Sequence, residues 1–82
     1  MKPRNTVPTV AAQRSQQGVT LEEIRETTKI RLFFLQAIES GEFHKLPGGI
    51  YSTSYIRQYA QAAGVDANQL LQQYQMTMQA GD

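Results

Sequence analysis

Residues 19–41 read VTLEEIRETTKIRLFFLQAIESG and describe two short helices joined by a tight turn. Thr20 stands where a helix needs an N-cap, and Glu23 follows at the spacing of a capping box. Val19 and Ile24 occupy the two positions of a hydrophobic staple. Two independent signals therefore place the start of the first helix at Thr20.

The second helix of this stretch is marked by four apolar residues that recur at helical spacing. These residues are Ile30, Phe34, Leu35 and Ile38. Gly41 then supplies a residue that tolerates the left-handed conformation after a helix end. We predict a helix from about Arg31 to Ser40, so that the two helices form a helix-turn-helix.

Further helices are predicted on both sides of this motif. A short helix over residues 9–17 ends at Gly18, and a longer one over residues 50–63 ends at Gly64. Asp66 is placed to cap a last helix, with Gln69 at the capping-box position and a staple formed by Val65 and Leu70. Between the motif and the longer helix, residues 41–49 contain Pro47 and three Gly and are predicted as an ordered connection.

The chain is therefore predicted to be all-α, a compact bundle of about five helices. We expect a flexible N-terminal arm over residues 1–8, the helix-turn-helix domain over residues 9–76, and a frayed C-terminal tail over residues 77–82. The predicted core consists of Leu21, Ile24, Ile30, Leu35, Ile38, Phe43, Leu46, Ile56, Tyr59, Leu70 and Leu71. We expect the hydroxyl of Tyr59 to reach the surface.

Composition excludes several classes of protein. The 82 residues include no Cys and carry a formal net charge of only +1, which offers neither a thiolate metal site nor strong attraction to nucleic acid. No stretch approaches the ~20 apolar residues of a membrane span, and no signal peptide is visible. His44, the only histidine, is expected on a surface loop. We predict a cytoplasmic, non-enzymatic protein with no metal, no cofactor and no small-molecule substrate.

The stretch from Arg14 to Tyr74, about three-quarters of the chain, resembles the cytoplasmic helix-turn-helix domain of the RodZ family. The most particular part is Phe43-x-x-Leu46-Pro47-Gly48 followed by an aromatic helix. Other matching residues are Gly18, Thr20 to Ile24, Thr28 to Arg31, Leu35, Ile38, Glu39, Gly41, Tyr51, Arg57, Tyr59, Ala60, Gly64 to Asp66, Leu70 and Leu71.

RodZ proteins are bacterial cell-shape proteins that tie the actin-like filament MreB to the inner membrane. The resemblance implies a bundle of the lambda-repressor-like class, an MreB-like partner, and a parent protein that continues past Asp82 into a membrane segment. It also implies that the partner contacts fall on Tyr51 and Tyr55, one helical turn apart, with Arg57 and Gln58 nearby. The alternative is that Tyr51 packs against Phe43 and Leu46.

The main rival function is that of a sequence-specific DNA-binding regulator, because in such proteins the second motif helix presents polar side chains to base edges. Its candidate residues are Lys29, Arg31, Leu32, Phe33, Gln36 and Ser40. Helical geometry places Leu32, Phe33, Gln36 and Ser40 on the exposed face. Leu32 and Phe33 suit DNA poorly and depart from the RodZ-like pattern, and one of them is alternatively expected to turn inward. We therefore predict a protein-binding module with weak duplex-DNA binding at most.

Overall fold

The computed structural model describes residues 9–80, so the predicted arm over residues 1–8 lies outside the described residues. The elements are α1 (Val10–Gln16), α2 (Leu21–Thr28), α3 (Leu32–Ser40), the 3-10 helix η1 (Phe43–Lys45), α4 (Gly49–Ala63) and α5 (Ala67–Ala80). The described part of the chain contains five α-helices and no strand. The prediction of an all-α helix-turn-helix bundle is confirmed.

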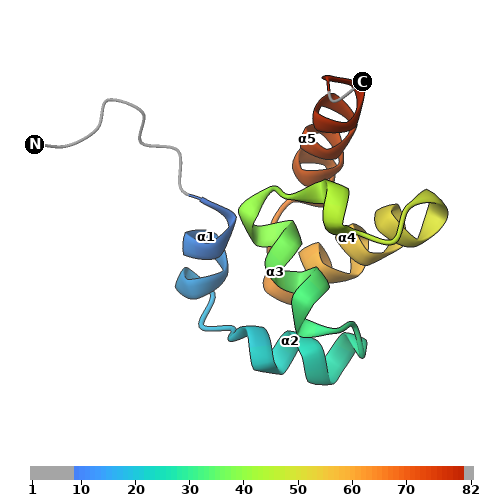
Figure 1. Ribbon diagram of the computed structural model, residues 1–82. Coiled ribbons are helices and arrows are strands. Elements are labelled where there is room, and N and C mark those ends of the chain that lie inside the picture. The colour runs from blue at the N-terminus through green and yellow to red at the C-terminus, as the bar shows by residue number, and fades with distance from the viewer. Residues whose placement is uncertain (1–8, 81–82) are drawn as a thin grey trace, which may run out of the picture.

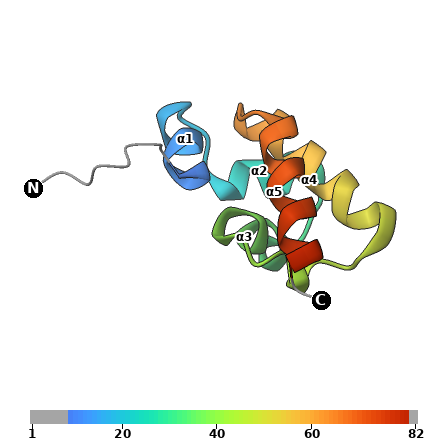
Figure 2. The same ribbon diagram turned by 90° about the horizontal axis from the view of Figure 1, so that it is seen from above.

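Helix α4 is the centre of the bundle, because it packs against α2, α3 and α5. The motif helices α2 and α3 cover one side of it, and α5 covers another (Figure 1). Helix α1 lies at one edge, and the N-terminal end of α4 lies at the opposite edge (Figures 1 and 2). This arrangement leaves parts of α3 and the first turns of α4 open to solvent.

The start of α2 is fixed as its sequence predicts. The Glu23 N–H donates to the Thr20 hydroxyl at 3.1 Å, and the Glu23 carboxylate accepts from the Thr20 N–H at 2.9 Å. At the other end of α2, Lys29 adopts the left-handed conformation with φ of 64°, the only positive φ of a non-glycine residue among those described. This residue turns the chain between α2 and α3.

The later boundaries are also close to their predicted places. Helix α3 begins at Leu32 with Arg31 as its N-cap, and Gly41 ends it at φ of 77°. The Asp66 carboxylate accepts a hydrogen bond from the Asn68 N–H at 2.9 Å and so caps α5. The tail was predicted to fray from residue 77. Helix α5 instead continues through residues 77–79 and ends at Ala80. Residues 81–82 lie outside the described part.

Most of the predicted core is buried. Leu21 and Leu71 are the exceptions, because both lie at the edge of the core and are only half-buried. Three alanines join the core as well, namely Ala37, Ala60 and Ala63. These small residues fill the narrow spaces in which α3 and α4 approach their neighbours.

The hydroxyl of Tyr59 does not reach the surface, which corrects the prediction. The whole side chain is buried, and its hydroxyl donates to Glu39 Oε2 at 2.7 Å. Arg14 of α1 also donates from its Nε to the Glu39 carboxylate, and its Nη1 donates to the Val19 carbonyl at 2.8 Å. The hydrogen bond to Glu39 raises the pKa of Arg14, and burial raises the pKa of Tyr59. This network joins α1, α3 and α4.

Candidate protein-interaction surface

Three aromatic side chains of α3 and α4 form a row in which each ring meets the next. The rings of Phe33 and Phe34 meet edge to face, with centroids 5.4 Å apart and planes inclined by 71°. Phe34 also meets Tyr55 of α4, with centroids 5.6 Å apart. Phe34 and Tyr55 are half-buried against the core, whereas Phe33 is 54% exposed. The aromatic group therefore runs from the inside of the bundle to the solvent.

Tyr51 lies one helical turn before Tyr55 and is 62% exposed. The start of α4 is held by the buried Ser52, whose hydroxyl accepts from the Gly48 N–H at 2.8 Å. Since Ser52 points inward, Tyr51 is turned outward on the first turn. The alternative in which Tyr51 packs against the η1 region is therefore wrong.

In place of Tyr51, the ring that contacts Phe43 comes from α5. Phe43 meets Tyr74 edge to face, with centroids 5.6 Å apart. This contact, between η1 and α5, closes the core under the connection and leaves Tyr51 free for another role.

Tyr55, Arg57 and Gln58 differ in how they are placed. Tyr55 does not project freely from α4, because its ring rests on Phe34. Gln58 is exposed, lies on the same flank as Tyr55 and donates to the Ser54 hydroxyl at 3.1 Å. Arg57 is exposed but lies about 200° round the helix from Tyr55. It therefore shares the flank of Ile50, away from the two tyrosines.

The candidate DNA-binding residues are only partly brought together. Phe33 and Gln36 are exposed as predicted, but Leu32 is half-buried and packs against the core. Leu32 is thus the member of the pair that turns inward. Ser40 is exposed, yet its hydroxyl donates to Glu42 Oε1 at 2.9 Å. Gln36 remains as the exposed polar side chain on this face of α3 that has no partner among the described residues.

The charges around α3 are unevenly paired. On α2, Arg25 forms ion pairs with Glu22 at 2.9 Å and with Glu26 at 3.1 Å. Lys29 and Arg31, just before α3, are exposed and form no ion pair within residues 9–80. Uncompensated positive charge therefore remains at the N-terminal end of α3.

After α3, Glu42 carries the negative charge of the connection. It accepts from Ser40 and from the Lys45 ammonium, the latter at 3.2 Å. These two hydrogen bonds lower the pKa of Glu42, and the one from Ser40 has the larger effect. The carboxylate is thus satisfied within the chain, and Lys45 stands beside it.

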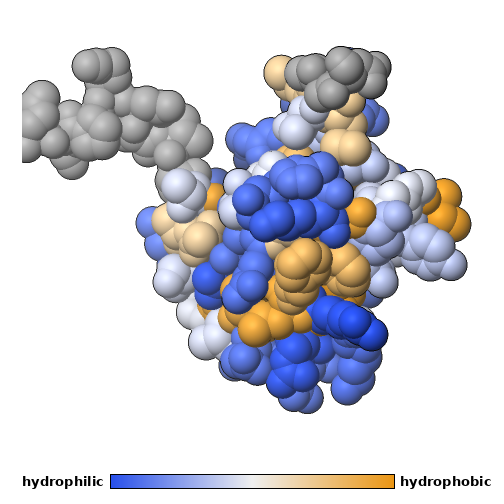
Figure 3. All heavy atoms as spheres, viewed as in Figure 1, coloured by the Kyte–Doolittle hydropathy of each residue, from blue (hydrophilic) through white to orange (hydrophobic). Residues whose placement is uncertain are grey.

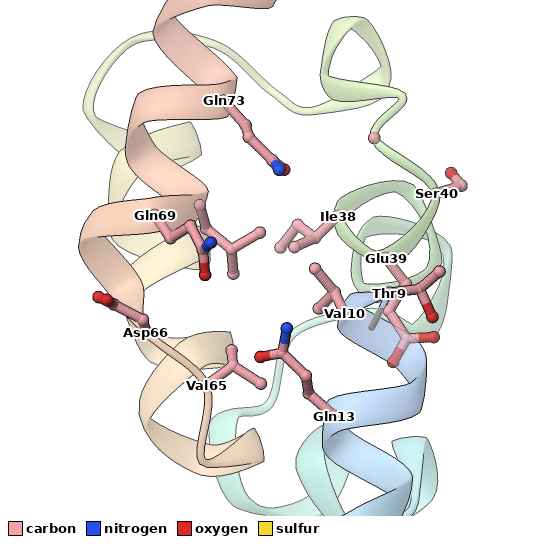
Figure 4. A pocket seen from close by; sticks show the side chains of 12 residues that line it. Thr9, Val10, Gln13, Ile38, Glu39, Ser40, Val65, Asp66, Gln69 and Gln73 are labelled. Carbon is pink, nitrogen blue, oxygen red and sulfur yellow. The ribbon is translucent and has the colours of Figure 1, made fainter. Parts of the chain in front are cut away.

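A separate cleft of about 230 Å³ lies between α1, α3 and the start of α5, with apolar Val10, Ile38 and Val65 pointing into it (Figure 4). Its two carboxylates are already engaged, Glu39 by Arg14 and Tyr59, and Asp66 by the first turn of α5. Both carboxylates of the cleft therefore have partners within the fold.

Within residues 9–80, no three His, Cys, Asp or Glu side chains gather in a way that could hold a metal ion. None of the helices in that range combines the length and the apolar character that crossing a membrane requires. His44 lies exposed on η1.

Comparison with known proteins gives the family. A family model described as a helix-turn-helix domain matches residues 9–70 of this chain. The chain belongs to this family. The match begins at the residue before α1 and ends within α5, so it includes the motif, the connection and the aromatic helix.

Two relatives of this helix-turn-helix domain agree with the resemblance to RodZ, which is confirmed. The domain is 36% identical over 61 residues to the cytoskeleton protein RodZ of Streptococcus pneumoniae, which is 74% of this chain and 22% of that protein. It is 38% identical over 56 residues to the uncharacterized membrane protein YmfM of Bacillus subtilis, 68% of this chain and 19% of that protein. The chain thus spans about a fifth of the length of these curated relatives. No solved structure matches it significantly.

Sequence reasoning on the helix-turn-helix domain missed two contacts. The Phe34 to Tyr55 contact joins two helices, and the Arg14 to Glu39 pair joins residues 25 positions apart. A signal for the first existed, because Phe34 belongs to the apolar stripe predicted for the second motif helix and therefore needed a neighbour to pack against. Nothing in the sequence pairs Arg14 with Glu39.

Proposed function

We propose that this helix-turn-helix domain is a non-enzymatic protein-interaction module that binds an MreB-like actin filament, as part of bacterial cell-shape control. The observation that carries the proposal is Tyr51, a large aromatic side chain held 62% exposed on the first turn of α4. Aromatic anchors of this kind commonly dominate the free energy of protein interfaces. The relative from Streptococcus pneumoniae, named a cytoskeleton protein, supports the assignment.

Tyr55 and Gln58 belong to the same proposed surface. Tyr55 lies one turn after Tyr51 and is held in place by Phe34, so its exposed edge costs little side-chain entropy to order on binding. Gln58 supplies an exposed amide beside it. Arg57 lies on the opposite flank, so we assign it a role at the rim, through its charge rather than through direct contact.

The parent protein of this domain is proposed to be tethered to the inner membrane by a segment outside this chain, with the domain in the cytoplasm. The relative from Bacillus subtilis that is named a membrane protein supports this arrangement. A domain of ~40 Å held in this way would link a filament to the bilayer.

The residues on the exposed face of α3 argue against sequence-specific DNA binding. Phe33 stands where a polar side chain would have to reach a base edge, and Ser40 donates to Glu42. One exposed amide, that of Gln36, is too few for the set of base contacts that specific readers make.

The proposal is tested by titrating the 82-residue chain against the MreB encoded in the same genome. We expect Tyr51→Ala to weaken binding by ~1 to 3 kcal/mol, as truncation of an interface anchor does. The circular dichroism spectrum should not change, because Tyr51 is exposed. Met76→Ala is the matched control, since Met76 is 68% exposed on α5. Undiminished binding by a folded Tyr51→Ala variant contradicts the proposal.

A further inference from the structure

Phe33 is an exposed aromatic residue that the fold does not need. It is 54% exposed on α3, and the core beneath that helix is already filled by Leu35, Ala37 and Ile38. Exposure of so large an apolar side chain in the middle of a small domain forgoes the stabilisation that its burial would give. A partner that covers Phe33 would recover this free energy.

Phe33 is also the end of an ordered row of rings. Phe34 and Tyr55 form the middle of the row and are held by the core, whereas Phe33 and Tyr51 stand exposed at its two ends. The rings of Phe33, Phe34 and Tyr55 therefore connect the second motif helix to α4 without a break. Tyr51 lies one turn before Tyr55 on α4 and extends the row. We call Phe33, Phe34, Tyr51 and Tyr55 the aromatic face.

The surroundings of the aromatic face are polar and charged. Figure 3 shows an apolar area over α3 between hydrophilic residues of α2 and of η1. The Lys45 ammonium lies 6.0 Å from the centroid of the Phe33 ring. Lys29 and Arg31 border the N-terminal end of α3 and have no ion pair among the described residues. An apolar centre with a partly uncompensated basic rim is complementary to an apolar protein surface edged by carboxylates.

We propose that the aromatic face is one continuous docking surface, and that Phe33 extends the partner contact from α4 onto α3. The occupant is the filament subunit, engaged through an apolar surface that carries carboxylates opposite Lys29 and Arg31. This inference rests on the function proposed above and adds that the second motif helix, rather than α4 alone, determines which partner binds.

An anionic lipid surface is the other class of partner that aromatic and basic residues can fit. It suits this face less well, because Glu26 lies beside Lys29 and Arg31, Glu42 pairs with Lys45 beside the Phe33 ring, and both carboxylates would be repelled by anionic headgroups. Polybasic membrane sites usually contain roughly four to eight cations. Among the described residues, two unpaired cations border this face, Lys29 and Arg31. A protein surface can match both signs of charge.

The test compares the two exposed ends of the aromatic face. Phe33→Ala, Phe33→Gln, Tyr51→Ala and the control Met76→Ala are each titrated against the filament subunit, with circular dichroism and thermal unfolding of every variant. We expect both Phe33 variants to bind about 5- to 30-fold more weakly while remaining folded, since alanine substitution at aromatic anchors has effects of this size. Met76→Ala should bind as the parent does.

The outcomes separate this inference from the function on which it rests. If Tyr51→Ala binds weakly but both Phe33 variants bind as the parent does, the docking surface stops at α4 and only the inference is wrong. If the parent chain does not bind the filament subunit, the proposed function and the inference both fall. Vesicles containing phosphatidylglycerol complete the test. If the parent chain binds these vesicles and the Phe33 variants do not, while the same variants still bind the filament subunit, the inference is overturned in favour of a lipid partner.

Discussion

Tyr59 shows how a single side chain can belong to the core and to a polar network at once. Its ring is fully buried beside Ala60 and Ala63, while its hydroxyl donates to Glu39. The ring position follows from the apolar periodicity of α4 and was predictable. The partner was not, because Glu39 lies 20 residues earlier on another helix, and its approach depends on how α3 packs against α4.

Tyr59→Phe should therefore reveal the hydrogen bond without opening a cavity. At neutral pH we expect the free energy of unfolding to fall by ~1.5 to 3 kcal/mol, the usual net contribution of a hydrogen bond to a charged group. Urea unfolding monitored by circular dichroism measures the change. Tyr51→Phe, which removes an exposed hydroxyl, is the matched control and should unfold as the parent does.

The same variant should change the dependence of stability on alkaline pH. Burial raises the pKa of the Tyr59 hydroxyl in the folded state, so the folded chain holds this proton at a pH where the unfolded chain releases it. Stability from this group is present below about pH 10, the pKa of a free tyrosine, and is lost as the pH rises further. The difference between the parent and Tyr59→Phe should shrink above that pH. A constant difference would show that the hydroxyl is not held as described.

At the scale of the elements, the helix ends were predictable because their signals are local. Thr20 and Glu23 cap α2 within one turn, and Gly41 and Gly64 end α3 and α4 in the left-handed conformation. The contacts between helices were less predictable. Tyr55 was expected to contact a partner, and only the approach of α3 brings Phe34 against it.

The turn between α2 and α3 is strained, because a residue other than glycine holds a left-handed conformation there. Lys29 holds a φ of 64°, a conformation that costs an L-residue roughly 1 to 2 kcal/mol and costs glycine little. Glycine loses about 0.5 to 1 kcal/mol more backbone entropy on folding. Lys29→Gly should therefore raise stability by ~0.5 to 1 kcal/mol, or the melting temperature by about 2 to 8 °C.

Lys29→Ala is the control for this turn, because it removes the same charge and keeps the strained backbone. It should melt close to the parent in differential scanning calorimetry. If both variants gain stability equally, the charge of Lys29 rather than its backbone conformation is what limits the turn.

At the scale of the whole molecule, the helix-turn-helix fold is present without the charge and the polar side chains that DNA recognition requires. The bundle keeps the two motif helices of a DNA-binding domain, yet the described charges nearly balance, and the formal net charge is only +1. The arrangement of α3 beside α4 places aromatic rings, rather than a set of polar side chains, along the exposed surface. The sequence indicated this through Leu32 and Phe33, but which of the two would be exposed depended on packing.

This arrangement predicts how the domain behaves toward duplex DNA. Lys29 and Arg31 are the unpaired cations of the motif among the described residues, so about two phosphates can be neutralised. The logarithm of the binding constant should then fall with the logarithm of salt concentration with a slope of about −2, and binding at physiological salt should be weaker than ~1 μM for any sequence. Fluorescence anisotropy with labelled duplexes measures both quantities.

Arg31→Gln should bring the slope nearer to −1, whereas Arg57→Gln, on the far flank of α4, should leave it unchanged. A sequence-specific complex with nanomolar affinity at physiological salt would show instead that α3 reads DNA, and that Phe33 lies against a base rather than against a protein.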